Sequence, residues 1–111
     1  MLAGARLQHA LRRRAVLIVA TCLREPCRAT ATGRIFVRGR SVGFRLNPAR
    51  QELGSGQRVT LRLRVGLSAV RGVRRALRRG HAVRAAILVV VVDAAGNRTV
   101  RDRTIRITAP I

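Results

Sequence analysis

The residues of this chain that could carry out chemistry are few and scattered. Its four acids stand far apart, and no two are spaced to act together as a general acid and a general base; they are Glu25, Glu52, Asp93 and Asp102. The chain has two histidines, His9 and His81, and no second cysteine pair to complete a four-ligand metal site. We therefore expect both imidazoles to face solvent or to form local hydrogen bonds, and we expect no metal site.

The serines do not suggest a nucleophile either. A nucleophile elbow needs a strand-to-helix turn, and none of the serines has that setting; they are Ser41, Ser55 and Ser68. No glycine-rich phosphate loop or dinucleotide fingerprint is present. The sequence predicts a protein that is not an enzyme and that holds no cofactor.

Cys22 and Cys27 are the two cysteines of the chain. A disulfide between them would close a small hairpin between strands at 15–21 and 27–32, where Pro26 already restricts the loop. Such a bond implies an oxidising compartment. Two free thiols in a cytosolic protein are the alternative.

The charge is the most unusual property of the sequence. The formal net charge is +20, and all 24 basic residues are arginine. A surface this positive attracts polyanions, whether nucleic acid, anionic lipid or cell-wall polymer. Arginine without lysine also fits compositional drift in a GC-rich coding sequence, which would leave only a solvated face. The candidate polyanion surface comprises Arg58, Arg62, Arg64, Arg71, Arg74, Arg75, Arg78 and Arg79.

Aromatic residues bear on the possibility of polyanion binding. Phe36 and Phe44 are the two aromatics, and we expect both at alternating core positions. Proteins that bind single strands usually stack bases on exposed rings. The sequence therefore predicts that any polyanion binding is electrostatic and weakly selective for sequence.

The elements that must position these residues are organised around residues 82–97, AVRAAILVVVVDAAGN. The β-branched run from Ile87 to Val92 predicts the central strand of a sheet. It ends in a turn formed by Asp93, Gly96 and Asn97, in which Asp93 either caps the turn or joins Asn97 in weak cation binding. A last strand follows at 98–108, and its change of parity predicts a bulge or an edge irregularity near residues 101–103.

The remaining elements follow from periodicity. Residues 58–65 alternate apolar and arginine or threonine, which predicts a strand with one buried face. Residues 67–79 have helical spacing, with Ser68 as a candidate N-cap and Gly80 as the stop; the apolar stripe is Leu67, Val70, Val73 and Leu77. Residues 47–57 predict a loop. Residues 15–21 predict a strand rather than a secretory signal, and this run is too short to span a membrane.

Three features together resemble a family. They are the apolar strand that leads into CLREPC, the short basic helix LSAVRGVRRALRRGH, and the strand that ends in DAAGN before a final strand. This order is similar to immunoglobulin-like or fibronectin-type-III-like modules of secreted and surface proteins from GC-rich bacteria. Antibody-type domains pair distant cysteines around a buried Trp, so the resemblance is to the looser bacterial group.

The resemblance implies an all-β fold, an antiparallel immunoglobulin-like β-sandwich with one short crossover helix at about 67–79. It implies a non-catalytic structural or interaction module, outside the cell or at its surface, whose partners are neighbouring domains of a longer chain or a cell-surface polymer. The alternative is a small basic polyanion-binding protein. We expect a basic lead-in or short helix at 1–14, the sandwich domain at 15–108 and a tail at 109–111, with no transmembrane segment.

Overall fold

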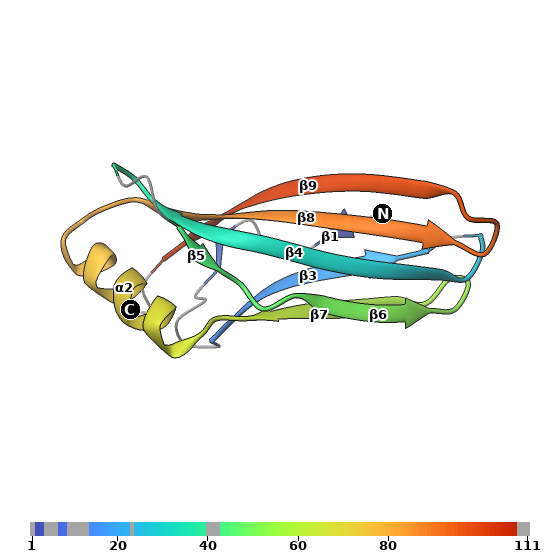
Figure 1. Cartoon of the computed structure of the whole chain (residues 1–111), viewed down its shortest axis with the longest axis horizontal. Coiled ribbons are helices and arrows are strands. Elements are labelled where there is room, and N and C mark those ends of the chain that lie inside the picture. The colour runs from blue at the N-terminus through green and yellow to red at the C-terminus, as the bar shows by residue number, and fades with distance from the viewer. Residues whose placement is uncertain (1, 4–6, 9–13, 23, 40–42, 109–111) are drawn as a thin grey trace.

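Two β-sheets pack face to face and one helix crosses between them at one end (Figure 1). The computed structural model describes residues 2–3, 7–8, 14–22, 24–39 and 43–108. The body is elongated, with extents of 47 × 27 × 20 Å. Within the described residues, the coarser expectation of an all-β sandwich with one helix is confirmed.

The smaller sheet has three antiparallel strands in the order β1 (Leu2–Ala3), β3 (Ala15–Thr21) and β7 (Arg58–Arg64). The larger sheet has the order β2 (Leu7–Gln8), β9 (Arg98–Ile107), β8 (Val83–Asp93), β4 (Cys27–Val37) and β5 (Phe44–Arg45). A further strand, β6 (Ala49–Leu53), pairs with another stretch of β4. Neighbours in this sheet are antiparallel, except that β2 runs parallel to β9.

Strand β8 is the central strand that the sequence predicts. It is paired along its whole length with β4, from Cys27↔Asp93 to Val37↔Val83, and with β9 on its other side. Its odd-numbered residues from 83 to 89 are buried, while the residues between them are exposed. Every second residue of the apolar run in β8 therefore faces the core. The residues between them make the outer face of this strand partly apolar.

The core between the sheets is aliphatic. Strands from both sheets contribute fully buried side chains, among them Ile18, Ile35, Leu63, Ile87 and Ile105. Each such side chain stabilises the fold by about 1.5–3 kcal/mol relative to exposure. The alternation predicted for residues 58–65 is confirmed, because Leu61 and Leu63 are buried whereas the arginines between and beside them are exposed.

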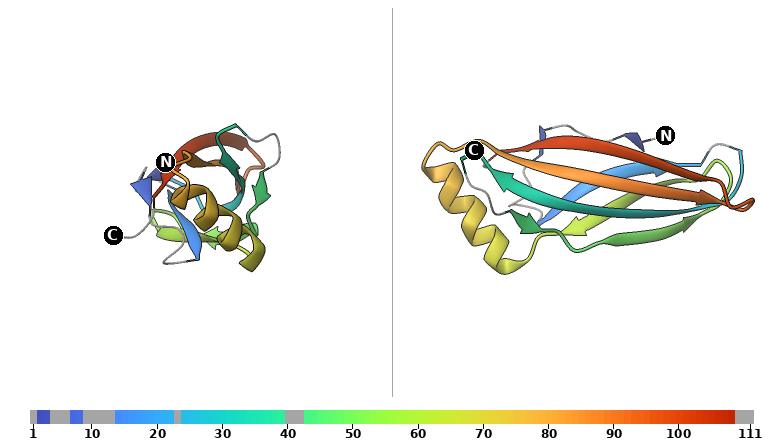
Figure 2. Two further views of the ribbon diagram at one scale, coloured as in Figure 1. Left: turned by 90° about the vertical axis from the view of Figure 1, so that its left-hand side faces the viewer. Right: turned by 45° about the horizontal axis from the view of Figure 1, so that its top comes forward.

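Helix α2 (Leu67–Arg78) carries the chain from β7 in the smaller sheet to β8 in the larger one (Figure 2). The predicted stop is confirmed: Gly80 has φ +76°, and the N–H groups of Gly80 and His81 donate to the carbonyls of Leu77 and Ala76. The predicted N-cap is wrong, since Gly66 occupies that position and Ser68 lies inside the first turn.

The apolar stripe of α2 also differs from the prediction. Leu67 is 60% exposed and Leu77 is half-buried, whereas Ala69 and Ala76 are buried beside Val70 and Val73. Small side chains let this helix approach the sheets closely, and Gly72 lies against the ring of Phe44.

Two further expectations are corrected. The interval 47–57 contains strand β6, whose hydrogen-bond partner is β4. Strands β3 and β4 do not pair as a hairpin but lie in different sheets.

The N-terminal segment stays a prediction. Residues 2–3 and 7–8 form two-residue strands, while residues 1, 4–6 and 9–13 of the expected lead-in or short helix, and the 109–111 tail, lie outside the described residues.

The bulge predicted near residues 101–103 is not formed in β9. The β8–β9 register is continuous from Val83↔Ile107 to Val92↔Arg98. The parity changes because the inward positions of β9 near the turn are polar, and Val100, on the outward face, is 45% exposed. The pairing of β9 is therefore regular, and only the polarity of its inward and outward side chains differs between the two halves of the strand.

Candidate functional site

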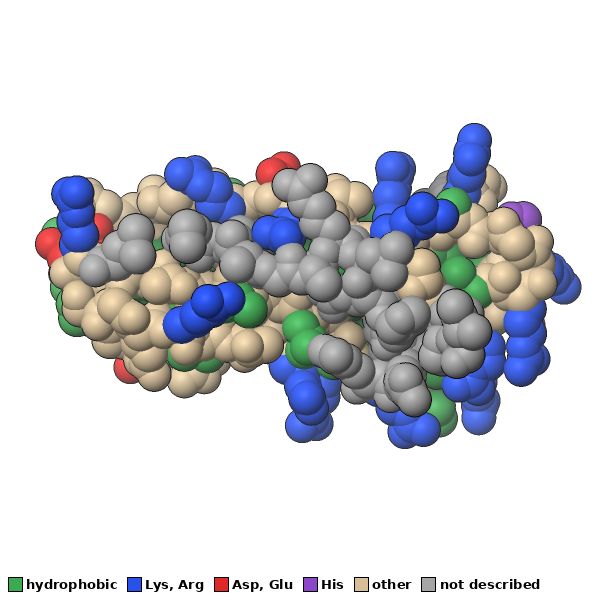
Figure 3. Space-filling view, turned by 180° about the vertical axis from the view of Figure 1, so that it is seen from behind, with side chains coloured by type: hydrophobic (Ala, Val, Ile, Leu, Met, Phe, Trp, Pro, Cys, Tyr) green, Lys and Arg blue, Asp and Glu red, His purple; other side chains and the backbone are tan. Residues whose placement is uncertain are grey.

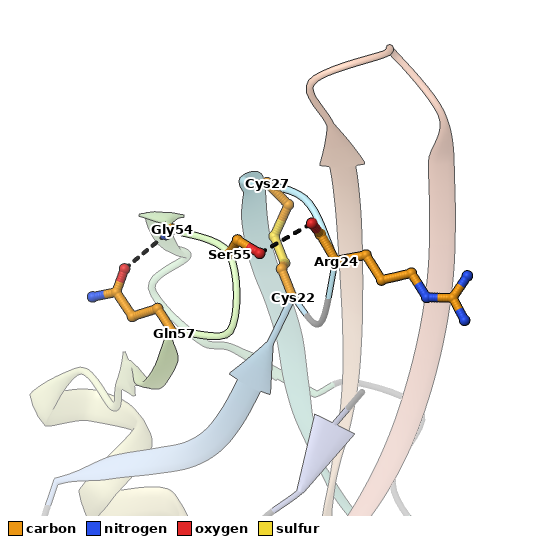
Figure 4. Close-up of a disulfide and its surroundings, with 6 residues drawn as sticks. All are labelled: Cys22, Arg24, Cys27, Gly54, Ser55 and Gln57. Atoms are coloured by element: carbon orange, nitrogen blue, oxygen red, sulfur yellow. Dashed lines mark hydrogen bonds between the residues drawn. A yellow bond between two sulfur atoms is a disulfide. The ribbon is translucent and has the colours of Figure 1, made fainter.

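A disulfide joins Cys22, just after β3, to Cys27, the first residue of β4, with the Cα atoms 6.2 Å apart (Figure 4). Because these strands belong to different sheets, the bond links the two layers at one end of the sandwich. We call this the disulfide end, and the opposite end the helix end. The predicted pairing of the two cysteines agrees with this geometry, although the two strands that they join are not paired with each other.

The disulfide loop is held to the loop between β6 and β7. The N–H of Gly56 donates to the carbonyl of Cys22 at 2.6 Å, and Ser55 Oγ donates to the carbonyl of Arg24 at 3.0 Å. The loop that carries Ser55 is in turn closed by Gln57, whose Oε1 accepts a bond from the N–H of Gly54 at 2.7 Å (Figure 4). Ser55 therefore has a structural contact on the surface.

The turn at Asp93 lies at the disulfide end as well. The Asp93 Oδ1 atom accepts hydrogen bonds from the N–H groups of Asn97 at 2.8 Å and Ala95 at 3.0 Å, and Oδ2 accepts one from Asn97 Nδ2 at 3.1 Å. Gly96 takes φ +85°, a conformation that favours glycine. These bonds, led by the backbone N–H of Asn97, lower the pKa of the Asp93 carboxyl. Both carboxylate oxygens accept hydrogen bonds within the turn, as the turn-capping role predicts.

A cleft of about 1050 Å³ opens beside β9 at the disulfide end. It is lined by both cysteines and by inward positions of β9, including Thr99, Arg101 and Arg103. Acids and arginines are mixed around it, so its walls have no single charge. Within the described part of the chain, no group of three or more His, Cys, Asp or Glu side chains is placed to hold a metal ion.

The eight arginines chosen from the sequence form two surfaces rather than one. Arg58, Arg62 and Arg64 are exposed on the outer face of the smaller sheet, where β7 forms one edge of its described part. The others are exposed on α2 and at its C-cap: Arg71, Arg74, Arg75, Arg78 and Arg79. Figure 3 shows arginine side chains gathered around the helix end, with the acidic side chains away from it.

A third basic surface was missed by the sequence reasoning. Arg34 faces Arg45 across β4 and β5, and Arg84 faces Arg106 across β8 and β9, on the outer face of the larger sheet. Phe36 lies on that same face directly beside Arg84, because its neighbours Ile35 and Val37 point into the core. The expectation that both phenylalanines occupy core positions is thus wrong for Phe36. Alternation along one continuous strand from 27 to 37 is the signal that would have placed Phe36 outside.

Other candidate residues take no part in a shared site. His81 and Ser68 are exposed, and His9 and Ser41 lie outside the described residues. No helix in the described part of the chain combines the length and the apolar character that crossing a bilayer requires. Comparison with known proteins finds no matching family model, no matching curated protein and no matching solved structure.

Proposed function

We propose that this chain is a non-catalytic, immunoglobulin-like β-sandwich module of an exported or cell-surface bacterial protein, and that it separates the segments on either side of it. The observation that carries the proposal is the path of the chain along the sandwich. Strand β1 lies beside the end of β3 that leads into the disulfide loop, with Leu2 opposite Ala20. Strand β9 runs from the disulfide end of the body to Ile107, which is opposite Val83 beside the helix end.

A segment before β1 would therefore approach from the disulfide half of the body, and a segment after β9 would leave at the helix end. Tandem copies joined in this way would lie end to end, and each would extend the chain by up to 47 Å. Side chains from both sheets close the core, so the two inner faces bury each other without a partner.

The disulfide supports the location. Disulfides persist in oxidising compartments and are rare in the cytosol. The Cys22–Cys27 bond joins the two sheets at the end where a preceding segment would attach.

The test is a chain that carries two copies of this sequence in tandem, studied by small-angle X-ray scattering. End-to-end joining predicts a maximum dimension close to twice the 47 Å length of one module. A second measurement, mass analysis of the exported protein after alkylation without reductant, predicts no modified thiol. Copies that fold side by side, with a maximum dimension near that of one module, would contradict the spacing role.

A further inference from the structure

The outer face of the larger sheet carries a compact arginine cluster. We define the four-arginine face as Arg34, Arg45, Arg84 and Arg106, all of which are exposed. The pair Arg84↔Arg106 is offset from the pair Arg34↔Arg45 by two residues along the strands, about 7 Å in that direction. The arginines therefore lie on four adjacent strands whose spacing is fixed by the sheet.

Like charges that face each other directly across strands destabilise a sheet. The positions that adjoin these arginines in register offer no acid to offset the charge: Arg34 is opposite Ala86, and Arg84 is opposite Phe36. The ion pair present among the described residues, Arg28–Glu52 at 2.9 Å, lies farther along β4 toward the disulfide end. A ligand with several negative charges would relieve the repulsion that the fold leaves in place.

The same face has a shallow depression of about 450 Å³. Arg34 and Arg45 line this depression. Phe36 lines it as well, together with apolar side chains from β8 and the β5–β6 connection, namely Ala86, Leu88 and Pro48. Cations beside an aromatic and aliphatic wall are the combination that binds phosphates and stacked bases together. Neither surface chosen from the sequence contains an aromatic residue.

We propose that the four-arginine face binds single-stranded nucleic acid, with phosphate groups on the guanidinium groups and one base in the depression against Phe36. The planar guanidinium fork matches phosphate oxygens in a bidentate way. A flexible single strand can turn its base toward the sheet while its backbone follows the arginines. This inference goes beyond the spacing role and does not depend on it, so either can fail alone.

The test is fluorescence anisotropy with a fluorescein-labelled oligothymidylate at low salt. The variant R34Q/R45Q/R84Q/R106Q removes the face, and the matched control R58Q/R62Q/R71Q/R78Q removes the same charge from β7 and α2. We expect the first to weaken binding by roughly a hundredfold and the control by only about threefold. The slope of log K against log salt should become shallower by about 0.7 for each phosphate that the variant no longer neutralises.

The base contact is tested at constant charge. F36L keeps an apolar side chain and should weaken binding about tenfold, because it removes the ring on which a base stacks. Since this variant could disturb the fold, competition with an abasic oligonucleotide of equal length provides an independent measurement on the natural chain. The abasic competitor should be about tenfold weaker than oligothymidylate.

The outcomes separate the explanations. Equal losses for the two quadruple variants would mean diffuse attraction to the whole +20 chain and would overturn the proposal. Equal competition by the abasic strand would mean a phosphate polymer without bases, such as a wall polymer, and would overturn the assignment to nucleic acid. Absence of binding at low salt would overturn it outright. Circular dichroism melting of each variant shows whether a loss of binding is a loss of folding.

Discussion

Gly72 of α2 lies directly against the ring of Phe44 in β5. A Cβ atom at position 72 would stand 3.0 Å from both Cε1 and Cε2 of Phe44, and nearer still to Cζ. This contact joins the helix to the larger sheet at a place where a side chain on the helix would push the two apart. It explains a glycine inside a helix, a position where glycine costs about 1 kcal/mol relative to alanine.

Replacing that glycine should destabilise the fold despite the better helix propensity of alanine. Overpacking costs about 1–3 kcal/mol, so we expect G72A to reduce the free energy of unfolding in urea by about 1 kcal/mol net. R71A, at the exposed neighbouring position, should change the free energy of unfolding by less than about 0.5 kcal/mol. Adding F44L to G72A should restore part of the stability, since leucine in place of the ring leaves room for the new methyl group. A G72A protein as stable as the natural chain would show that α2 does not need this contact.

Removing the disulfide should also lower stability, but by a different route. The Cys22–Cys27 loop is short, with a sequence separation of 5, and closing such a loop destabilises the unfolded chain by about 2 kcal/mol through its lower entropy. We expect C22A/C27A, and the natural chain after reduction, to show the same loss of stability in denaturant unfolding. Unequal losses would mean that the alanines perturb the loop themselves.

The elements with strong alternation could be predicted from sequence because burial alone determines them. Strands β7 and β8 bury every second residue over much of their length, and Gly80 ends α2 through its positive φ. Strand β6 was missed because its sequence, ARQEL, places only Leu53 in the core. Its identity as a strand comes from hydrogen bonds to β4, which leave no apolar pattern in the sequence.

The other differences between the sequence predictions and the structure come from the pairing of strands. Cys22 and Cys27 are near in sequence, so a hairpin is the simplest prediction, but β3 pairs with β7 and β4 with β8. The four-arginine face was missed for the same reason. Arg84 and Arg106 come together only through the β8–β9 register, and nothing local to either residue indicates its partner.

The turn after β8 should depend on pH through Asp93. The pKa of its carboxyl lies below the ordinary value for aspartate, chiefly because the N–H of Asn97 donates to the carboxylate. A carboxyl group with a lowered pKa in the folded state stabilises the fold above its unfolded pKa, and this stabilisation is lost as pH falls through the folded pKa. We expect the melting temperature of the natural chain to exceed that of D93N at neutral pH, and the difference to shrink in strong acid.

Asn97→Ala separates the two kinds of hydrogen bond to that carboxylate. It removes the side-chain donor at 3.1 Å and keeps the backbone donor at 2.8 Å. A carboxyl titration followed by NMR should therefore give a pKa for Asp93 that is still lowered in this variant, though by less. A pKa at the ordinary value in N97A would assign the whole effect to the side-chain amide.

The repulsion between Arg84 and Arg106 should be measurable without any ligand. Arg106→Thr removes one of two like charges that face each other directly, so it should stabilise the chain at low salt by a few tenths of a kcal/mol. The gain should fade near 1 M salt, where the Debye length falls to about 3 Å. Arg98→Thr is the matched control, because Arg98 is exposed on the same strand but faces Val92. If both variants gain equally at low salt, the benefit comes from lowering the net charge of the whole chain. If R106T alone gains, the sheet itself carries a local charge conflict that an anionic ligand at this face would relieve.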